Sequence, residues 1–254
     1  MPWNPGAKQA PFETLFCATP KFEYPFRQGV FSFAMKSQIQ FVEIPGNPAK
    51  SAPPFSWMWQ HPVFAWAGVR APIAQHTLAE HQALMRHAGA KNTVVEIGVA
   101  EGASAAGLRE AMPADGTLYL IDPFHLSRIP ALNFLKRAAR RAVGAAGSAR
   151  TVWIELFSQD AARDWKSSID FLLIDGDHRE DAVERDWLDW SRFVAPSGIV
   201  AFHDARLFPS GWPTPDYGPV RFVDRAFRQV SNNVEWSIIE EVDSLVFVSR
   251  RNRS

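Results

Sequence analysis

Cysteine is almost absent from this sequence, which contains a single one, at position 17. One cysteine allows neither an intrachain disulfide nor a cluster of thiolate ligands around a metal ion. Long apolar runs are missing as well: no stretch reaches the roughly 18 residues that a membrane-spanning helix needs. Net charge is also absent, because 27 basic and 27 acidic residues cancel. This balance gives no support for a nucleic-acid partner or an anionic membrane surface.

The beginning of the chain lacks the pattern of a signal peptide, because no basic segment followed by an apolar core comes after Met1. We therefore expect a cytoplasmic protein. Residues 1–70 differ from the rest, since they hold 10 of the 19 prolines and 14 of the 32 aromatic residues. We expect an N-terminal extension at 1–70 and the main domain at 71–254. The extension is interpreted either as a segment packed on the domain or as a lid or dimer contact, and both interpretations stay open.

Strand-like and helix-like segments alternate through the main domain. Thr77, with Glu80 three residues later, predicts a capping box at the start of its first helix. The alternation predicts a three-layer α/β/α, Rossmann-like fold with a mostly parallel sheet. The expected strands are one that ends near Glu96 and six at 117–121, 150–157, 169–174, 199–202, 236–242 and 245–250, which makes a seven-stranded sheet.

A glycine turn follows the first of these strands. The run Val94-Val95-Glu96-Ile97-Gly98-Val99-Ala100-Glu101-Gly102 leads from a buried strand to a helix that is expected to begin at Ser104. Such a strand, turn and helix N-terminus bring the backbone close to a bound ligand. The pattern has two glycines four positions apart and lacks the third glycine of a dinucleotide site. A nucleoside without a pyrophosphate therefore fits this turn better.

Polar side chains gather at the expected carboxyl ends of the strands, where ligands bind in sheets of this kind. Asp122 follows the second strand and is placed to bond the hydroxyls of a ribose. Glu96 is interpreted either as a cofactor contact or as a brace for the turn. The remaining members of the set are Ser158, Asp175, His178, His203 and Asp204.

Four motifs give the sequence a resemblance to a known family. They are the glycine turn at 94–102, Leu-Ile-Asp at 120–122, Leu-Leu-Ile-Asp-Gly-Asp-His at 172–178 and Ile-Val-Ala-Phe-His-Asp at 199–204. Together they resemble class I S-adenosylmethionine-dependent methyltransferases, and more narrowly the group of macrocin-type sugar O-methyltransferases and cephalosporin-hydroxylase-like proteins. The resemblance covers about residues 75–250. It implies an antiparallel last strand and transfer of a methyl group to a hydroxyl of a sugar or natural-product acceptor.

The resemblance also implies where S-adenosyl-L-methionine binds. The turn would contact the methionine part, Asp122 would hold the ribose, and Ser158 with Asp160 would lie near the adenine. A side chain at position 98 would then occupy the space of the ligand, so Gly98→Val should abolish cofactor binding. Ser158 has an alternative role as the N-cap of the following helix. The full set expected to bind the cofactor is Glu96, Gly98, Ala100, Gly102, Ser104, Asp122, Ser158 and Asp175.

Members of this group often hold a divalent ion, usually magnesium, and the matching positions here are Asp175, His203 and Asp204. His203 stands where relatives carry an acid, and imidazole suits zinc, manganese or iron better than magnesium. His178 and His203 are both candidates for the base that removes the proton of the acceptor hydroxyl. A small-molecule acceptor is the expected partner, and a homo-oligomer is the expected protein assembly.

Two other functions compete with this interpretation. Asp175-Gly176-Asp177 is an Asp-x-Asp pattern that would suit a metal-dependent nucleotide-sugar glycosyltransferase, although the glycine turn would then have no role. A catalytically inactive scaffold that only binds the cofactor is the second alternative. A nicotinamide dehydrogenase is disfavoured by the missing third glycine.

Overall fold

The computed structural model describes residues 40–41, 61–124, 133–209, 211–229 and 235–251. Residues 35–254 form one compact unit, and every described residue belongs to it. The lid or dimer contact expected at 1–70 therefore falls mainly outside the described residues and stays a prediction. Among the described residues, no helix has the length and apolar character needed to cross a bilayer.

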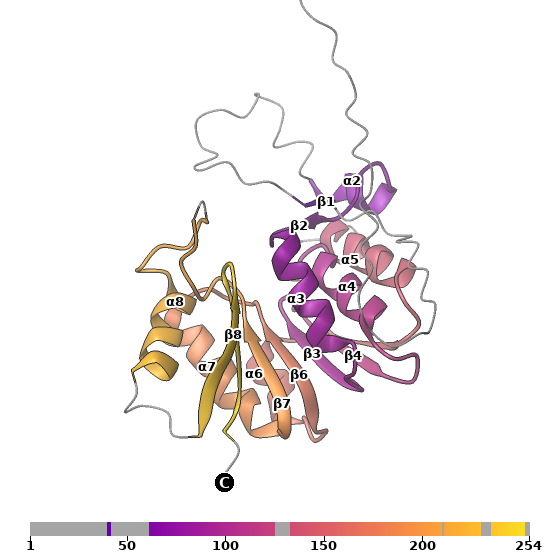
Figure 1. Cartoon of the computed structure of the whole chain (residues 1–254). Coiled ribbons are helices and arrows are strands. Elements are labelled where there is room, and N and C mark those ends of the chain that lie inside the picture. The colour runs from indigo at the N-terminus through magenta and orange to yellow at the C-terminus, as the bar shows by residue number, and fades with distance from the viewer. Residues whose placement is uncertain (1–39, 42–60, 125–132, 210, 230–234, 252–254) are drawn as a thin grey trace, which may run out of the picture. The chain divides into compact units, whose positions relative to one another are not determined.

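A seven-stranded sheet is the centre of the domain (Figure 1). Its strand order is β5-β4-β3-β6-β7-β9-β8. Neighbouring strands are parallel from β5 to β7, whereas β9 is antiparallel to both β7 and β8. The expected mostly parallel sheet with an antiparallel last strand is confirmed. The strands are β3 (Thr93–Ile97), β4 (Thr117–Ile121), β5 (Arg150–Ile154), β6 (Ile169–Ile174), β7 (Val194–Phe202), β8 (Trp236–Val242) and β9 (Leu245–Arg250).

Helices cover both faces of the sheet, as Figure 1 shows. One face packs against α3 (Leu78–Ala88), α4 (Ala103–Ala111) and α5 (Phe134–Ala145). The other face packs against α6 (Ser158–Arg163), α7 (Glu180–Trp190) and α8 (Gly218–Val223). Successive residues of a strand point to opposite faces, so Val94 belongs to the first core and Val95 to the second. The three-layer α/β/α arrangement is thereby confirmed.

Two expected strands have different bounds in the structure. The strand expected at 150–157 ends at Ile154, because its partner β4 ends at Ile121 and the two residues pair. The strand expected at 199–202 begins at Val194, which pairs with Ile169 before an irregularity in the register. Pairing with a neighbouring strand determines both bounds, and the sequence of one strand alone does not reveal this pairing.

The helix expected to begin at Ser104 begins one residue earlier, at Ala103. The segment after α7 is a 3₁₀ turn at Ser191–Phe193, and α8 continues into a π-helical turn at Asp224–Arg228. The predicted capping box of α3 is confirmed: Thr77 Oγ1 accepts from the Glu80 amide at 3.1 Å, and the Glu80 carboxylate accepts from the Thr77 amide at 2.7 Å.

Within the described residues, three short elements precede α3. Strand β1 (Gln40–Phe41) pairs in parallel with β2 (Ile73–Ala74) in a separate two-stranded sheet. Helix α2 (Pro62–Ala67) begins after His61, whose side chain accepts from the Val63 amide. Trp66 of α2 lies 5.3 Å from the Phe134 ring of α5, measured between ring centroids. The described part of the expected extension therefore contacts the main domain.

Candidate active site

A cavity of about 710 Å³ opens at the carboxyl ends of the parallel strands. Its wall is built from the loops after β3, β4, β5 and β6, together with the segment that contains β2. Several residues expected from the sequence line this cavity: Gly98, Ala100, Ser104, Asp122, Ser158, Asp175 and His178. Glu96, Gly102, His203 and Asp204 are buried nearby and do not form part of the lining.

The glycine turn has a left-handed backbone at three positions, with φ of 86° at Gly98, 47° at Ala100 and 81° at Gly102. A Cβ on Gly98 would lie 2.0 Å from the carbonyl oxygen of Asp175. Position 98 therefore lacks a side chain because the backbone after β6 passes close to it. A Cβ on Gly102 would lie 3.0 Å from Ala139 of α5, so this glycine allows α4 and α5 to approach.

Asp122 holds the turn from the end of β4. Its Oδ2 accepts from the backbone amides of Val99 at 2.9 Å and Ala100 at 3.3 Å, and its Oδ1 accepts from the Phe124 amide at 2.8 Å. The carboxylate thus shapes the turn before any ligand arrives. Since a carboxylate has about four acceptor positions, roughly one remains for a donor in the cavity.

Glu96 is fully buried beneath the turn. The Ser104 hydroxyl donates to its Oε1, while Oε2 has no hydrogen-bond partner among the described residues. Burial raises the pKa of Glu96 well above its usual range. Because Ser104 lines the cavity and Glu96 does not, Glu96 reaches the cavity wall only through the Ser104 hydroxyl.

Ser158 is the first residue of α6, and the N-cap position belongs to Phe157. The Ser158 hydroxyl donates to Oδ1 of Asp186 on α7, so it does not serve as the helix cap. Phe157 and Gln159 line the cavity beside Ser158. Asp160, expected near an adenine, forms an ion pair with Arg163 at 3.0 Å and does not line the cavity.

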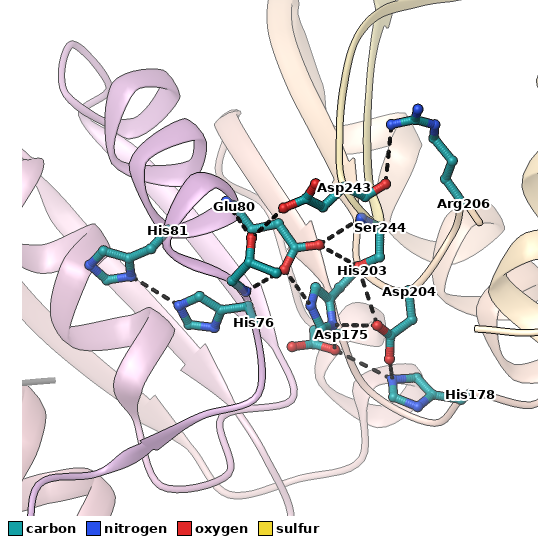
Figure 2. A network of polar contacts seen from close by, with 11 residues as sticks. His76, Glu80, His81, Asp175, His178, His203, Asp204, Arg206, Asp243 and Ser244 are labelled. Atoms are coloured by element: carbon teal, nitrogen blue, oxygen red, sulfur yellow. Dashed lines mark hydrogen bonds and ion pairs between the residues drawn. The ribbon is translucent and has the colours of Figure 1, made fainter. Parts of the chain in front are cut away.

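Asp175, His178, His203 and Asp204 form a polar cluster at the ends of β6 and β7, shown in Figure 2. His203 Nδ1 lies 2.9 Å from Asp175 Oδ1 and 3.4 Å from Asp204 Oδ1. His178 Nε2 lies 3.4 Å from the same Asp175 oxygen and 3.8 Å from Asp204 Oδ2. Asp204 adopts a left-handed backbone with φ of 54°. The sequence predicted that these four residues meet, and the structure brings them together.

Charge in this cluster is unevenly distributed. Burial alone would lower the pKa of His203, but the charges of Asp175 and Asp204 raise it well above its usual value. Burial opposes ionisation of Asp175, yet the charge of His203 and the hydrogen bond from His178 hold its pKa below the usual range. Burial also acts against a charged His178, whose pKa is raised by its hydrogen bond to Asp175. The favoured state is therefore an imidazolium between carboxylates.

Glu80 is a site residue that the sequence did not reveal. Its Oε2 lies 3.8 Å from His203 Nε2, on the side of the ring opposite Asp175 (Figure 2). Burial would raise the pKa of Glu80, but its interaction with His203 lowers it. The capping-box pattern explained Glu80 within its own helix, and for that reason nothing in the sequence indicated a second contact with His203.

The turn between β8 and β9 completes the cluster. The Ser244 amide and hydroxyl donate to Glu80 Oε1 at 2.7 and 2.6 Å, and the same hydroxyl lies 3.3 Å from Asp204 Oδ1. The Thr77 hydroxyl donates to Oδ2 of Asp243 at 2.6 Å. From the sequence, Asp243 and Ser244 are only the connection between two strands. Their partners Thr77 and Glu80 are more than 160 positions away, so no local sequence pattern indicates these contacts.

Further polar side chains lie next to the cluster. Tyr217 OH lies 2.6 Å from His178 Nδ1 and thereby fixes the orientation of that ring. His76 lines the cavity, and its Nε2 lies 2.9 Å from His81 Nδ1. Burial lowers the pKa of His76 to about 3 and that of His81 to about 4, so both rings stay neutral.

An ion pair fixes the segment that contains β2 to the glycine turn. Arg70 Nη1 and Nη2 each lie 2.6 Å from an oxygen of Glu101, and Glu101 also accepts from the Ile73 amide at 3.0 Å. Both side chains are buried. Since Ile73 and Glu101 line the cavity, this pair holds two parts of its wall together.

Three donor atoms in the polar cluster could coordinate one metal ion. One ligand atom each from Asp175, His178 and His203 lie within 4.8 Å of one another. Two of these donors are imidazole nitrogens. Magnesium prefers oxygen ligands in octahedral geometry, whereas imidazole suits zinc, manganese or iron. The donor set thus fits magnesium poorly and fits a transition metal better.

Comparisons with known proteins agree with this architecture. A family described as "Methyltransferase domain" matches residues 95–205, which include the glycine turn and Asp204. The O-methyltransferase TomG from Streptomyces achromogenes, in complex with SAM, is 15% identical with a TM-score of 0.50, over 79% of this chain and 91% of that chain.

Two further solved structures are similar to a comparable extent. Cofactor-bound Rv0187 from MTB is 17% identical with a TM-score of 0.54, over 80% of this chain and 93% of that chain. An O-methyltransferase from Bacillus cereus, in complex with SAH, is 13% identical with a TM-score of 0.50, over 80% and 94%. At these identities the structural likeness concerns the fold.

Proposed function

We propose that this chain is a class I S-adenosylmethionine-dependent methyltransferase and that it transfers the donor's methyl group to a hydroxyl of a sugar or natural-product acceptor. One observation carries the proposal: a single cavity is lined both by the glycine turn with Asp122 and by Asp175 with His178. The first pair of features suits a nucleoside donor. The second pair offers a place for an acceptor hydroxyl and its proton.

In the proposed reaction the acceptor oxygen attacks the methyl carbon of the sulfonium. An O–C bond forms as the S–C bond breaks, and sulfur leaves as the neutral thioether. The hydroxyl proton goes to a neutral histidine, which is the only proton transfer that this chemistry requires. The methyl donor supplies the activated methyl group when it is bound.

We assign the proton-accepting role to His178. It lines the cavity, whereas His203 is 4% exposed and lies between Asp175, Asp204 and Glu80. In the neutral tautomer that donates Nδ1–H to Tyr217, His178 Nε2 carries no proton and can accept one; its hydrogen bond to Asp175 forms when that nitrogen is protonated. The carboxylate charges then stabilise the resulting imidazolium. His203 is in this proposal a positioning residue for Asp175.

Calorimetry with S-adenosylhomocysteine, UDP-glucose and NAD tests the donor class. We expect S-adenosylhomocysteine to bind and the other two to fail. Binding of UDP-glucose without S-adenosylhomocysteine would favour a glycosyltransferase and contradict the proposal. A methyl-transfer screen against polyhydroxylated acceptors then separates an active enzyme from an inactive scaffold.

His178→Gln tests the assigned base. Loss of a general base typically lowers kcat by about 10²- to 10⁴-fold, and cofactor affinity should stay close to the wild-type value. His203→Gln serves as the comparison, because we expect it to alter the environment of Asp175. If His203→Gln alone abolished turnover while His178→Gln kept it, the roles of the two histidines would be reversed.

A divalent metal ion is a second proposal for the cluster of Asp175, His203 and Asp204. The donor chemistry leads us to propose zinc, manganese or iron in preference to magnesium, with His178 Nε2 as a further ligand. That nitrogen cannot bind a metal and accept the hydroxyl proton at once, so the two proposals exclude each other at His178. Metal titration of the purified apo-protein by calorimetry distinguishes them, and tighter binding of Mg²⁺ than of Mn²⁺ or Zn²⁺ would contradict this metal assignment.

A small-molecule partner follows from the same reasoning. The acceptor has to reach a cavity of about 710 Å³ that already contains the donor. The balance of 27 basic and 27 acidic residues also gives a nucleic acid no general attraction.

A further inference from the structure

Tyr217 is a polar residue behind His178 that the proposed reaction does not use. It holds the N-cap position of α8, its side chain makes no capping hydrogen bond, and it does not line the cavity. Its hydroxyl oxygen lies 2.6 Å from His178 Nδ1, and the centroids of the two rings are 5.3 Å apart. His178 itself lines the cavity. Tyr217 therefore reaches the proposed reaction only through the ring of His178.

The backbone beside Tyr217 allows this close approach. A Cβ on Gly218 would overlap the His178 carbonyl oxygen and the Glu180 amide nitrogen. A side chain at position 218 would thus push the start of α8 away from the loop after β6. Arg225, in the turn that continues α8, forms an ion pair with Glu180 of α7 at 3.2 Å. These contacts keep α8 against α7 and the Tyr217 hydroxyl beside Nδ1.

We propose that Tyr217 is the positioning residue of His178, because its hydroxyl holds Nδ1 on the side of the ring away from the cavity. Nε2 is then the nitrogen that faces the acceptor hydroxyl, at 3.4 Å from Asp175 Oδ1 and 3.8 Å from Asp204 Oδ2. This inference rests on the proposed role of His178 as proton acceptor. The hydrogen bond at one imidazole nitrogen determines what the other nitrogen can do.

The same hydroxyl acts when the proton has been transferred. Both nitrogens of the His178 ring then carry hydrogen, so Nδ1–H donates to the Tyr217 oxygen. Burial raises the pKa of Tyr217 to about 12, and the hydroxyl therefore remains neutral at pH 7. A hydrogen bond from a charged donor is stronger than one between neutral groups, and its loss corresponds to about 10- to 100-fold in rate.

Tyr217→Phe tests the proposal, because it removes the hydroxyl and keeps the ring that contacts His178. We expect kcat for methyl transfer to the acceptor found in the screen to fall by about 10- to 100-fold. The KM of the acceptor and the affinity for S-adenosylhomocysteine should stay within about twofold of the wild-type values. Circular dichroism checks the fold.

Tyr119→Phe is the matched control. It removes the same hydroxyl from a ring of β4 that packs against Trp165, with 4.6 Å between ring centroids. We expect this variant to keep the wild-type kcat. An equal loss of kcat in Tyr119→Phe would assign the effect to packing and contradict the role of Tyr217.

A double variant separates positioning from a general structural effect. If Tyr217 acts through His178, then adding Tyr217→Phe to His178→Gln should lower kcat no further. If the two losses multiply in the double variant, Tyr217 acts independently of His178 and the inference is overturned.

Nuclear magnetic resonance gives a measurement that needs no acceptor. Nitrogen–proton correlation spectra report on the imidazole rings, and the His178 signals are those lost in His178→Gln. We expect Tyr217→Phe to move the signal of His178 Nδ1 and Tyr119→Phe to leave it in place. An unmoved signal in folded Tyr217→Phe overturns the inference.

The outcomes distinguish this inference from the proposed function. Normal kcat in Tyr217→Phe together with a slow His178→Gln overturns the inference and leaves the proposed function intact. Normal turnover in His178→Gln removes the assigned base and this inference with it. Failure of the wild-type protein to bind S-adenosylhomocysteine overturns the proposed function, and the resonance measurement still decides whether Tyr217 orients His178.

Discussion

The structure gives Gly98 a different reason for being glycine from the one that the sequence suggested. From the sequence, a side chain at this position was expected to occupy the space of the ligand. In the structure the nearest obstacle is the protein itself, because a Cβ would lie 2.0 Å from the Asp175 carbonyl oxygen. The glycine is needed for the backbone crossing from which the cavity is built.

Gly98→Ala should therefore destabilise the whole domain and not only weaken ligand binding. We expect a loss of more than about 2 kcal/mol, because the left-handed backbone and the steric overlap both act against a side chain. Urea unfolding without any ligand measures this loss. Gly144→Ala is the control, since no atom lies within 4 Å of its Cβ position in α5, and it should gain about 0.5–1 kcal/mol. Normal stability of Gly98→Ala with lost ligand binding would restore the original explanation.

The other predicted site residues form two groups: some line the cavity, and others are buried beneath it. Asp122 and Asp175 line it as a strand-end position suggests, because a sheet brings such ends together. Glu96 and Gly102 belong to the same motif and serve the packing beneath it. A sequence motif does not separate these two classes, since both depend on the same turn.

Glu80 and Asp186 could not have been found from the sequence. Each lies inside a helix, where the local pattern offers an ordinary explanation, and each acts through a partner far along the chain. Glu80 meets His203 and Ser244, and Asp186 meets Ser158. Their roles appear only after the elements have packed.

At the scale of elements, strand pairing explains the bounds that the sequence missed. Leu156 and Phe157 are apolar residues beyond Ile154 and Glu155, but β4 offers no further partner there. Residue propensity and periodicity identify the strand, whereas pairing with the neighbouring strand determines its length. The capping box of α3 was correct because all its contacts lie within four residues.

The pair of Arg70 and Glu101 joins β2 to the glycine turn, and its energetic effect can be measured. Arg70→Ala leaves a buried carboxylate without its cation, so we expect a loss of about 3–5 kcal/mol in urea unfolding. Lys136→Ala removes an exposed pair with Glu155 and should cost less than about 1 kcal/mol. Combining Arg70→Met with Glu101→Gln should recover most of the loss. Similar effects of Arg70→Ala and Lys136→Ala would show that the buried pair is energetically ordinary.

At the scale of the whole molecule, buried histidines should control stability at acid pH. Burial lowers the pKa of His81 to about 4, against an ordinary value of 6.5. Its contribution to stability is therefore fully present above pH 6.5 and is lost as the pH falls towards 4, by about 1.4 kcal/mol per pH unit. Urea unfolding at several pH values should give His81→Asn a shallower decline than the wild type. His203 acts in the opposite direction, because its pKa is raised and protonation favours its folded environment. Parallel curves for wild type and His81→Asn would contradict the assignment.

The fold as a whole was accessible from the sequence because alternating strands and helices leave few arrangements. The mostly parallel sheet and its two packed faces agree with that expectation, and the antiparallel β9 agrees with what the resemblance implied. For the cavity, only the approximate position could be predicted from the sequence. The turn and the strand ends give its position, while the contacts that fix its walls come from Arg70, Glu80 and Ser244, which carry no recognisable pattern.

The connection between β8 and β9 has a consequence for how the protein is made on the ribosome. Ser244 must reach Glu80 and Asp204, and β9 must pair with β7, before the cluster is complete. A nascent chain that has not yet reached residue 250 exposes the β7 edge and leaves these carboxylates without their hydroxyl donor. Such an exposed edge favours aggregation at this stage of synthesis. The turn into β9 and its pairing with β7 thus complete both the sheet and the polar cluster.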